Sequence, residues 1–203
     1  MAGIVLAAGE SRRMGQPKQL LSAGGETLLN RVLGQALNAC LDPVVLVLGF
    51  ESGRIQSSLG ALYHHPKLLL VENPWFREGM STSLISGLAA VEHDRDHIMV
   101  LLGDMPHVTS SLMNRLCNET IASGCPLGAV TVRGRRSLPV VIGRPLYEEV
   151  WNLTGDEGAR SLFQRHPDWV CRVETEGEYD DMDVDTPEDF TRFRNGTLRQ
   201  GGK

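Results

Sequence analysis

A loop rich in glycine and positive charge follows the first apolar run of the chain. It contains Gly9 and Gly15 together with the cations Arg12, Arg13 and Lys18. Glycine permits backbone conformations closed to other residues, so amide N–H groups can converge on an anion while the cations supply countercharge. The loop therefore predicts a phosphate-binding site, and a triphosphate is the expected ligand.

The same residues also have an ordinary structural explanation. Arginine and lysine in loops are usually solvated, and a glycine after a strand often only makes a turn. The loop does not match the dinucleotide pattern G-x-G-x-x-G. It is not a P-loop either, because it contains no Gly-Lys-Ser/Thr and Lys18 follows a proline. The conjunction of glycines and cations favours the anion site.

Carboxylates occur at two further places where a metal ion could be held. Asp104 comes shortly after the apolar run 97–102, at the end of an expected strand, and is a natural magnesium ligand. Asp183 and Asp185 precede a proline-started helix, and alternation in an extended segment puts both on one face. As an alternative, Asp104 begins a turn or caps the helix expected near 109.

A third informative segment surrounds Gly79, Ser81 and Ser83, just before an expected helix. Small residues and hydroxyls at such a place can contact the edge of a nucleobase. The alternative is a serine N-cap with Trp75 in the core.

Apolar runs and amphipathic stretches alternate through the first 123 residues. Strands are expected at 3–8, 44–48, 68–71 and 97–102, and helices at 27–39, 53–60, 81–92 and 109–123. This alternation indicates right-handed βαβ units and a mainly parallel sheet, with ligands beyond the carboxyl ends of the strands.

The pattern loosens after residue 124, where a second group of elements is expected. Strands are predicted at 127–133, 138–142 and 169–173, with a turn at 134–136, and helices at 144–152, at 157–166 and from 187. We expect a single domain over residues 1–194 and a flexible tail over 195–203.

Composition excludes several classes of protein. The chain has 203 residues, is 41% hydrophobic and carries a net charge of −5, which disfavours broad nucleic-acid binding. Its four cysteines form no C-x-x-C pair, so neither a zinc site nor a redox dithiol is indicated. No targeting segment and no run of eighteen apolar residues is present, so we expect a cytoplasmic protein without membrane contact.

The first loop resembles that of the MobA-like nucleotidyltransferases, and among them most closely the molybdenum cofactor cytidylyltransferases. It fills every fixed position of L-A-A-G-x-S-x-R-M-G-x-x-K, from Leu6 to Lys18. D-x-D-T-P-x-D at 183–189, G-x-S-x-S at 79–83 and G-D-x-G-A-R at 155–160 also match family elements. The resemblance implies an α/β fold, a Rossmann-like three-layer αβα sandwich with a mainly parallel sheet, of the nucleotide-diphospho-sugar transferase type.

The resemblance also implies site residues. Asp104 and Asp185 would bind Mg²⁺ with Asp183 in the outer shell, and Arg13, Lys18 and Asp104 would be catalytic. Asp156 and Arg160 would lie on the acceptor side. The nucleotide would be bound by Leu6, Ala7, Ala8, Gly9, Ser11, Arg12, Arg13, Gly15, Lys18, Gly79, Ser81 and Ser83.

The implied reaction is transfer of CMP from CTP to a phosphate acceptor, most closely molybdenum-loaded molybdopterin, with release of pyrophosphate. L-A-A-G is the form associated with cytosine, whereas guanylyltransferases of the family carry L-A-G-G. One departure weakens the identity of the acceptor: Ser137-Leu138-Pro139 stands where family members often carry Gly-His-Pro. A molybdoenzyme or its chaperone would be the protein partner.

Three alternatives remain. The acceptor could be another small phosphate such as a sugar phosphate, or the chain could be a non-catalytic protein that binds the cofactor and delivers it to a molybdenum hydroxylase. A nicotinamide-dependent oxidoreductase is disfavoured because the three-glycine fingerprint is missing.

Overall fold

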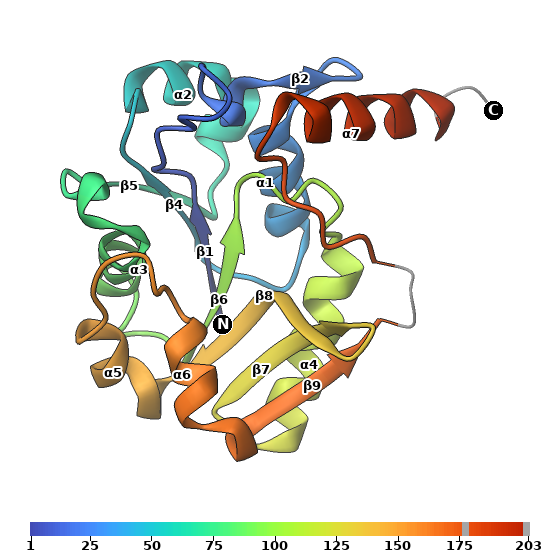
Figure 1. The fold of residues 1–203 in the computed structure, drawn as a ribbon. Helices are drawn as coiled ribbons and strands as arrows, with labels where there is room; N and C mark the ends of the chain where they lie inside the picture. The colour runs from blue at the N-terminus through green and yellow to red at the C-terminus, as the bar shows by residue number, and fades with distance from the viewer. Residues whose placement is uncertain (176–178, 201–203) are drawn as a thin grey trace.

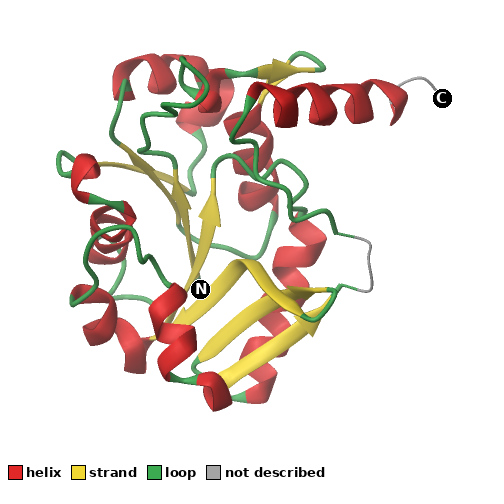
Figure 2. Cartoon of the chain, viewed as in Figure 1, coloured by secondary structure: helices red, strands yellow, loops and turns green. Residues whose placement is uncertain are grey.

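A computed structural model describes residues 1–175 and 179–200. In this part of the chain, one seven-stranded sheet forms the centre of the molecule, in the order β5-β4-β1-β6-β8-β7-β9 (Figures 1 and 2). Its strands are β1 (Ala2–Leu6), β4 (Val44–Leu48), β5 (Leu68–Glu72), β6 (His97–Leu102), β7 (Leu127–Val132), β8 (Arg135–Gly143) and β9 (Val170–Glu174).

All of these strands except β8 run in the same direction, so the sheet is mainly parallel. β1 pairs in parallel with β4 and β6, whereas β8 lies antiparallel between β6 and β7. The β7–β8 connection is a two-residue turn at Arg133 and Gly134, both with positive φ, and Val132 pairs with Arg135. The turn expected at 134–136 is therefore one residue shorter and earlier, and β8 starts three residues before position 138.

Helices cover both faces of the sheet, which confirms the three-layer sandwich. One face carries α1 (Leu28–Asn38), α2 (Ser52–Ser58) and α4 (Ser110–Ser123), and the other carries α3 (Met80–Ala89), α5 (Tyr147–Trp151) and α6 (Arg160–Arg165). Short 3-10 helices at Lys18–Leu20, Gly60–His64, Phe76–Glu78, Arg144–Leu146 and Pro167–Trp169 complete this part.

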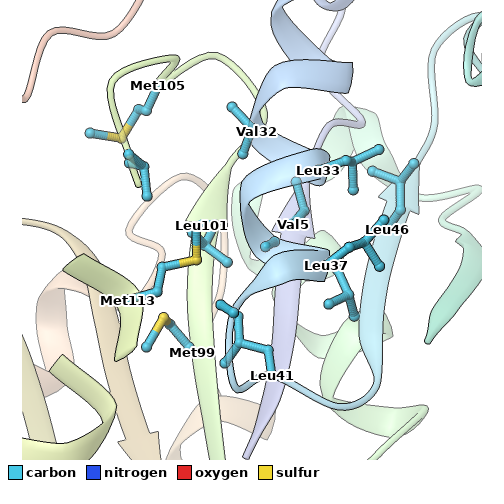
Figure 3. Close-up of a cluster of buried hydrophobic side chains, with 14 of the residues drawn as sticks. Val5, Val32, Leu33, Leu37, Leu41, Leu46, Met99, Leu101, Met105 and Met113 are labelled. Atoms are coloured by element: carbon cyan, nitrogen blue, oxygen red, sulfur yellow. The ribbon is translucent and has the colours of Figure 1, made fainter. Parts of the chain in front are cut away.

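Strand β1 shows why the apolar runs are continuous rather than alternating. Val5 joins the buried cluster under α1, α2 and α4, whereas Ile4 and Leu6 join the cluster under α3, α5 and α6. Figure 3 shows Val5 between the α1 side chains Val32, Leu33 and Leu37 and the side chains of neighbouring strands. A strand covered on both faces needs apolar residues at every position.

Two elements outside the sandwich bring distant parts of the chain together. A hairpin of β2 (Ser22–Ala23) and β3 (Glu26–Thr27), which the sequence patterns did not predict, packs with α7 (Pro187–Gln200) in a small apolar cluster that includes Leu28, Val184 and Phe193. This packing holds the segment before α7 against the first loop. The helix continues to Gln200, past the domain end expected at 194, and residues 201–203 lie outside the described residues.

The start of α7 is stabilised by a reciprocal pair of hydrogen bonds. The Asp189 N–H donates to Thr186 Oγ1 at 3.2 Å, and the Thr186 N–H donates to Asp189 Oδ2 at 3.0 Å. These bonds, together with the Thr186 hydroxyl, lower the pKa of Asp189. We expect Thr186→Ala to reduce the free energy of unfolding by about 1 kcal/mol, measured by urea denaturation. Ser110→Ala, inside α4, is a control that removes no N-cap.

None of the helices in the described part of the chain combines the length and apolar character needed to cross a bilayer.

Candidate active site at the carboxyl edge of the sheet

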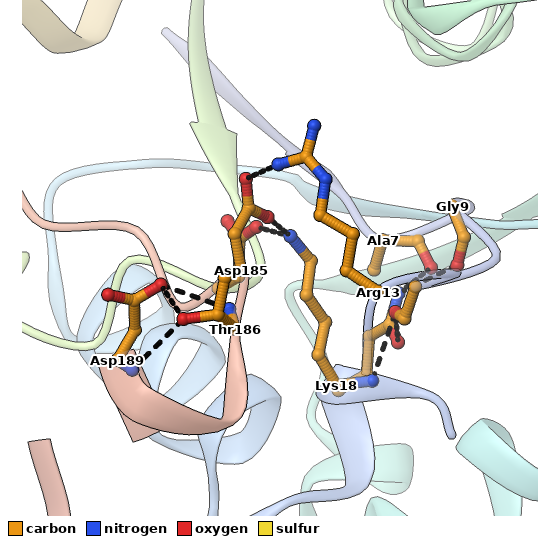
Figure 4. Close-up of polar contacts among 10 residues, drawn as sticks. Ala7, Gly9, Arg13, Lys18, Asp185, Thr186 and Asp189 are labelled. Atoms are coloured by element: carbon orange, nitrogen blue, oxygen red, sulfur yellow. Dashed lines mark hydrogen bonds and ion pairs between the residues drawn. The ribbon is translucent and has the colours of Figure 1, made fainter. Parts of the chain in front are cut away.

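Three segments meet where β1 and β6 end, and a lysine joins them. Lys18, which follows β1 by way of the glycine-rich loop, forms ion pairs with Asp104 and with Asp185, the latter at 2.5 Å from Nζ to Oδ1. Figure 4 shows the Lys18 ammonium pointing at Asp185, with Arg13 on the other side of the same carboxylate. The Val184 N–H also donates to the Asp104 carbonyl at 3.1 Å. The fold thus brings together the two predicted metal ligands from opposite ends of the sequence.

Burial differs strongly among these charged groups. The Asp104 side chain is 9% exposed and that of Lys18 17%, whereas the Asp185 side chain is 39% exposed. Burial raises the pKa of Asp104 against the opposing effect of Lys18, and the nearby Asp183 and Asp185 raise it further. Burial alone would lower the pKa of Lys18, but the two carboxylates outweigh it and hold that pKa above its usual value. The Lys18 ammonium therefore lies charged between the two carboxylates of Asp104 and Asp185.

These carboxylates fit a divalent cation. Asp104 Oδ1 is buried and makes no hydrogen bond, so one acceptor oxygen is free for a ligand. The Lys18 ammonium already lies where a positive charge is attracted from two sides. No three His, Cys, Asp or Glu side chains of residues 1–175 and 179–200 gather closely enough to hold a metal by themselves. Waters or a ligand's phosphates would complete the shell, as is common for Mg²⁺.

The conformation of the first loop depends on different residues from those expected. Gly15 has φ +67°, but Gly9 has no positive φ and open space for a Cβ, so its expected conformational role is wrong. Ser11 instead takes the left-handed conformation, with φ +52°, and its hydroxyl accepts from the Lys18 N–H at 3.0 Å. The buried Gln19 donates to the carbonyls of Ala7 at 3.0 Å and Gly9 at 3.3 Å.

The two arginines of this loop lie differently. Arg13 is 76% exposed and lies 3.5 Å from Asp185, at the edge of the charged cluster. Arg12 pairs with Glu10 at 2.7 Å and is not among the residues that line a cavity. Only Arg13 and Lys18 therefore reach the predicted metal ligands.

A cavity of about 220 Å³ opens beside Lys18 and Asp104 and combines the first loop with the start of α3. Leu6, Ala7, Ala8 and Gly9 form one wall. The other predicted nucleotide-binding residues among its lining are Lys18, Gly79 and Ser83. Of the predicted set, Ser11, Arg12, Arg13, Gly15 and Ser81 lie outside this lining.

Gly79 has no room for a side chain. Its φ is +117°, and a Cβ there would lie 2.7 Å from the Cα of Gly155 and closer still to its carbonyl. The Ser81 N–H donates to the Gly155 carbonyl at 3.0 Å. Ser81 therefore lies inside α3, whose N-cap is Gly79 without a side-chain hydrogen bond, and Trp75 is 62% exposed. The alternative of a serine N-cap with Trp75 in the core is wrong.

A second cavity, of about 370 Å³, adjoins the first, and both are lined by Leu6, Met80, Leu102 and Asp156. Asp156 accepts from the Met80 N–H at 3.1 Å and so caps α3 while standing between the cavities. Arg160 and Asp183 line the larger cavity but not the smaller one. Asp183 therefore faces the larger cavity, apart from the pair of Asp104 and Asp185 at Lys18.

The larger cavity is largely apolar and is lined by two arginines, Arg136 and Arg160. Arg136 lies over the Phe163 ring, 4.6 Å from its centroid, and burial together with the neighbouring Arg160 lowers its pKa. Among the described residues, neither arginine has a carboxylate partner. Leu138 stands in this wall. The same cavity is also lined by four acidic residues, Asp156, Glu157, Asp181 and Asp183, so it offers a ligand an apolar surface beside groups of both charges.

Sequence reasoning missed several residues of the site. Gln19, Phe76, Met80 and Gly103 line the smaller cavity, and Arg136 and Phe163 line the larger one. The position of Gly103, directly after the strand that ends in Leu102, was a usable signal. Nothing local distinguishes Gln19 or Phe163.

The chain is similar over nearly its whole length to three characterised bacterial proteins. It is 33% identical to the purine catabolism protein PucB of Bacillus subtilis, covering 96% of each chain. It is 32% identical to nicotine blue oxidoreductase of Paenarthrobacter nicotinovorans, over 95% of this chain and 96% of that one. Identity to molybdenum cofactor cytidylyltransferase of Escherichia coli is 26%, over 92% of each.

Solved structures show the same architecture. A homologue of Mycobacterium tuberculosis Rv0371c from Mycobacterium sp. strain JC1 superposes with a TM-score of 0.84 at 29% identity, covering 98% of this chain and 97% of that one. Rv0371c of M. tuberculosis H37Rv, solved as a complex with manganese, gives 0.78 at 27% identity, covering 96% and 97%.

The family model for the MobA-like NTP transferase domain matches residues 3–170, which contain the first loop, the start of α3 and Asp104. With two carboxylates, a lysine and paired cavities at the carboxyl edge of the sheet, the chain belongs to the MobA-like NTP transferase family.

Proposed function

We propose that the protein is a Mg²⁺-dependent cytidylyltransferase, which transfers CMP from CTP to a phosphate acceptor and releases pyrophosphate. The acceptor we favour is molybdenum-loaded molybdopterin. The observation that carries this proposal is the bridging of Asp104 and Asp185 by Lys18 at the mouth of the smaller cavity. Similarity to molybdenum cofactor cytidylyltransferase and the manganese complex of Rv0371c support the chemistry and the use of a divalent metal.

In this proposal, charge stabilisation supplies most of the catalysis. Mg²⁺ held by Asp104 and Asp185 would neutralise charge that develops on the α-phosphate and the departing pyrophosphate. Lys18 then turns from the carboxylates to the triphosphate, and Arg13 adds a second positive charge at the exposed side. A phosphate monoester is already ionised near neutral pH, so its oxygen can attack without a dedicated base.

The two cavities suit the two substrates. The smaller one would bind the nucleotide between Ala7–Gly9 and Gly79–Ser83, and the larger one would bind the acceptor against its apolar wall, with Arg136 and Arg160 near its negative charge. Asp156 lines both cavities and would lie between the two bound substrates.

Two rival functions can be tested directly. A delivery protein would bind the acceptor or its product without turnover. One relative is named an oxidoreductase. A nicotinamide-dependent oxidoreductase is disfavoured for this chain because the first loop lacks G-x-G-x-x-G. The assay combines the protein with Mg²⁺, each nucleoside triphosphate and molybdenum-loaded cofactor, and identifies products by mass. CMP-linked product with pyrophosphate supports the proposal. Binding without product overturns it, as does oxidation of NADH or NADPH by the protein in a separate reaction followed by absorbance.

Base selection gives a sharper prediction. Because the Ala8 methyl group narrows the smaller cavity, we expect CTP to bind more tightly than GTP, and Ala8→Gly to reduce that preference without reversing it. Competition between CTP and GTP in a binding titration measures both effects. Ala61→Gly, outside both cavities, is the matched control. Tighter binding of GTP by the unmodified protein would exclude cytidylyl specificity but leave nucleotidyl transfer in place.

A further inference from the structure

One carboxylate lies within the loop that should receive an anion. Glu10 is flanked by Gly9 and Ser11, and its side chain is only 19% exposed. A carboxylate at this place repels a triphosphate unless its charge is neutralised. The loop pattern accepts any residue at position 10, so the resemblance assigns Glu10 no role.

Two arginines neutralise Glu10, one on each oxygen. Arg12 Nε lies 2.7 Å from Oε2, and Arg77 Nε lies 2.8 Å from Oε1. The hydrogen bond from Arg77, and to a smaller extent the one from Arg12, lowers the pKa of Glu10. Arg12 belongs to the same loop, but Arg77 comes from the 3-10 helix Phe76–Glu78. The carboxylate therefore links two segments that are 67 residues apart.

The segment at the far end of this link also lines the smaller cavity. The Arg77 guanidinium lies over the Phe76 ring, 5.3 Å from its centroid, and Phe76 lines the cavity together with Ala8 and Gly9. Phe76 also closes the space above Gly49, where a Cβ would lie 2.7 Å from the Phe76 Cβ and 2.9 Å from the Ala8 Cβ. The Phe76 side chain thus packs against Gly49 and against the Arg77 guanidinium.

From this geometry we infer that Glu10 is a positioning residue, which ties the phosphate loop to the Phe76 wall and so sets the width of the nucleotide cavity. The inference rests on the proposed nucleotide binding. It predicts the direction in which nucleotide affinity changes when Glu10 is replaced. If Glu10 acted only as a negative charge near the triphosphate, its removal would tighten binding. If it holds the two walls together, its removal weakens binding, even of a nucleotide with few phosphates.

The test is a binding titration of CTP and of CMP, without acceptor, to the protein and to Glu10→Gln and Arg77→Gln. We expect each variant to raise the Kd of both nucleotides about fivefold, the scale of one or two surface ion pairs. The double variant should bind no more weakly than either single one, because both remove the same link. In steady-state kinetics, each variant should have an unchanged kcat at saturating CTP and a raised KM for CTP.

The matched control is Glu119→Gln, which removes a similar ion pair with Arg115 on α4, outside both cavities. Tighter CTP binding by Glu10→Gln, an unchanged Kd, or a loss confined to CTP would overturn the inference. Failure of the proposed function looks different, because the unmodified protein would then bind neither CTP nor CMP in this titration.

Discussion

Asp104→Asn is expected to lower nucleotidyl transfer by about 10²- to 10³-fold or more, since a preorganised electrostatic group acts directly on the reacting phosphate. Asparagine keeps the shape of the side chain but removes the charge that Oδ1 and Oδ2 offer to Mg²⁺. The loss should appear as slower pyrophosphate release at saturating CTP and Mg²⁺. The thermal unfolding midpoint with and without the substitution shows whether the fold is intact.

Asp185 and Asp183 supply the comparison for this prediction. Asp185 pairs with Lys18, whereas Asp183 lines the larger cavity, so Asp185→Ala should cost much more activity than Asp183→Ala. Normal turnover by Asp104→Asn would remove that residue from the metal site. Equal tolerance of both alanine variants would remove the segment before α7.

Lys18→Met should have the second largest effect, a fall in kcat/KM for CTP of about 10²-fold. Methionine fills the volume of the lysine stem but supplies no charge to the triphosphate. It also removes the ammonium that pairs with the buried Asp104 and leaves Asp185 with the exposed Arg13, so the free energy of unfolding should fall at neutral pH. Mg²⁺ should restore part of that stability, measured as a larger Mg²⁺-dependent rise in Tm than the unmodified protein shows.

Lys67→Met is the control, because the Lys67 ammonium lies within hydrogen-bonding distance of the Leu37 and Ala39 carbonyls, far along the chain from the first loop. A near-normal kcat/KM in Lys18→Met would show that Lys18 has only a structural role, as a partner in ion pairs. A fall in activity without a greater response to Mg²⁺ would separate its role toward the nucleotide from its role between the carboxylates.

The sequence predicts most of the sandwich because its signals are local. Val44 to Leu48 are buried on both faces of the sheet, and α1 buries the periodic set that begins with Leu28 and Leu29. Residues at strand ends must share one edge when the strands are parallel, so the nearness of Lys18 and Asp104 follows from topology. The alternation that placed Asp183 and Asp185 on one face gave no means of separating them.

Other features depend on contacts between distant segments and leave no local pattern. The residue with left-handed backbone conformation is Ser11 rather than Gly9. The loop is held in this conformation by the hydrogen bonds from the Lys18 N–H to Ser11 and from Gln19 to the Ala7 carbonyl. Glu10 pairs not only with Arg12 but also with Arg77, which comes from a segment 67 residues away. A short hairpin such as Ser22 to Thr27 has too few residues for any periodicity to show.

The wall formed by Asp156 and the start of α3 belongs to both cavities, and this has a thermodynamic consequence. Displacement of this wall by one bound ligand would alter the free energy of binding for the other, and the effect must be equal in both directions. If CTP tightens the hold on the acceptor by some factor, the acceptor tightens the hold on CTP by that same factor. The order in which the two substrates enter then leaves the total binding free energy unchanged, and Asp156 is where their cooperativity would be set.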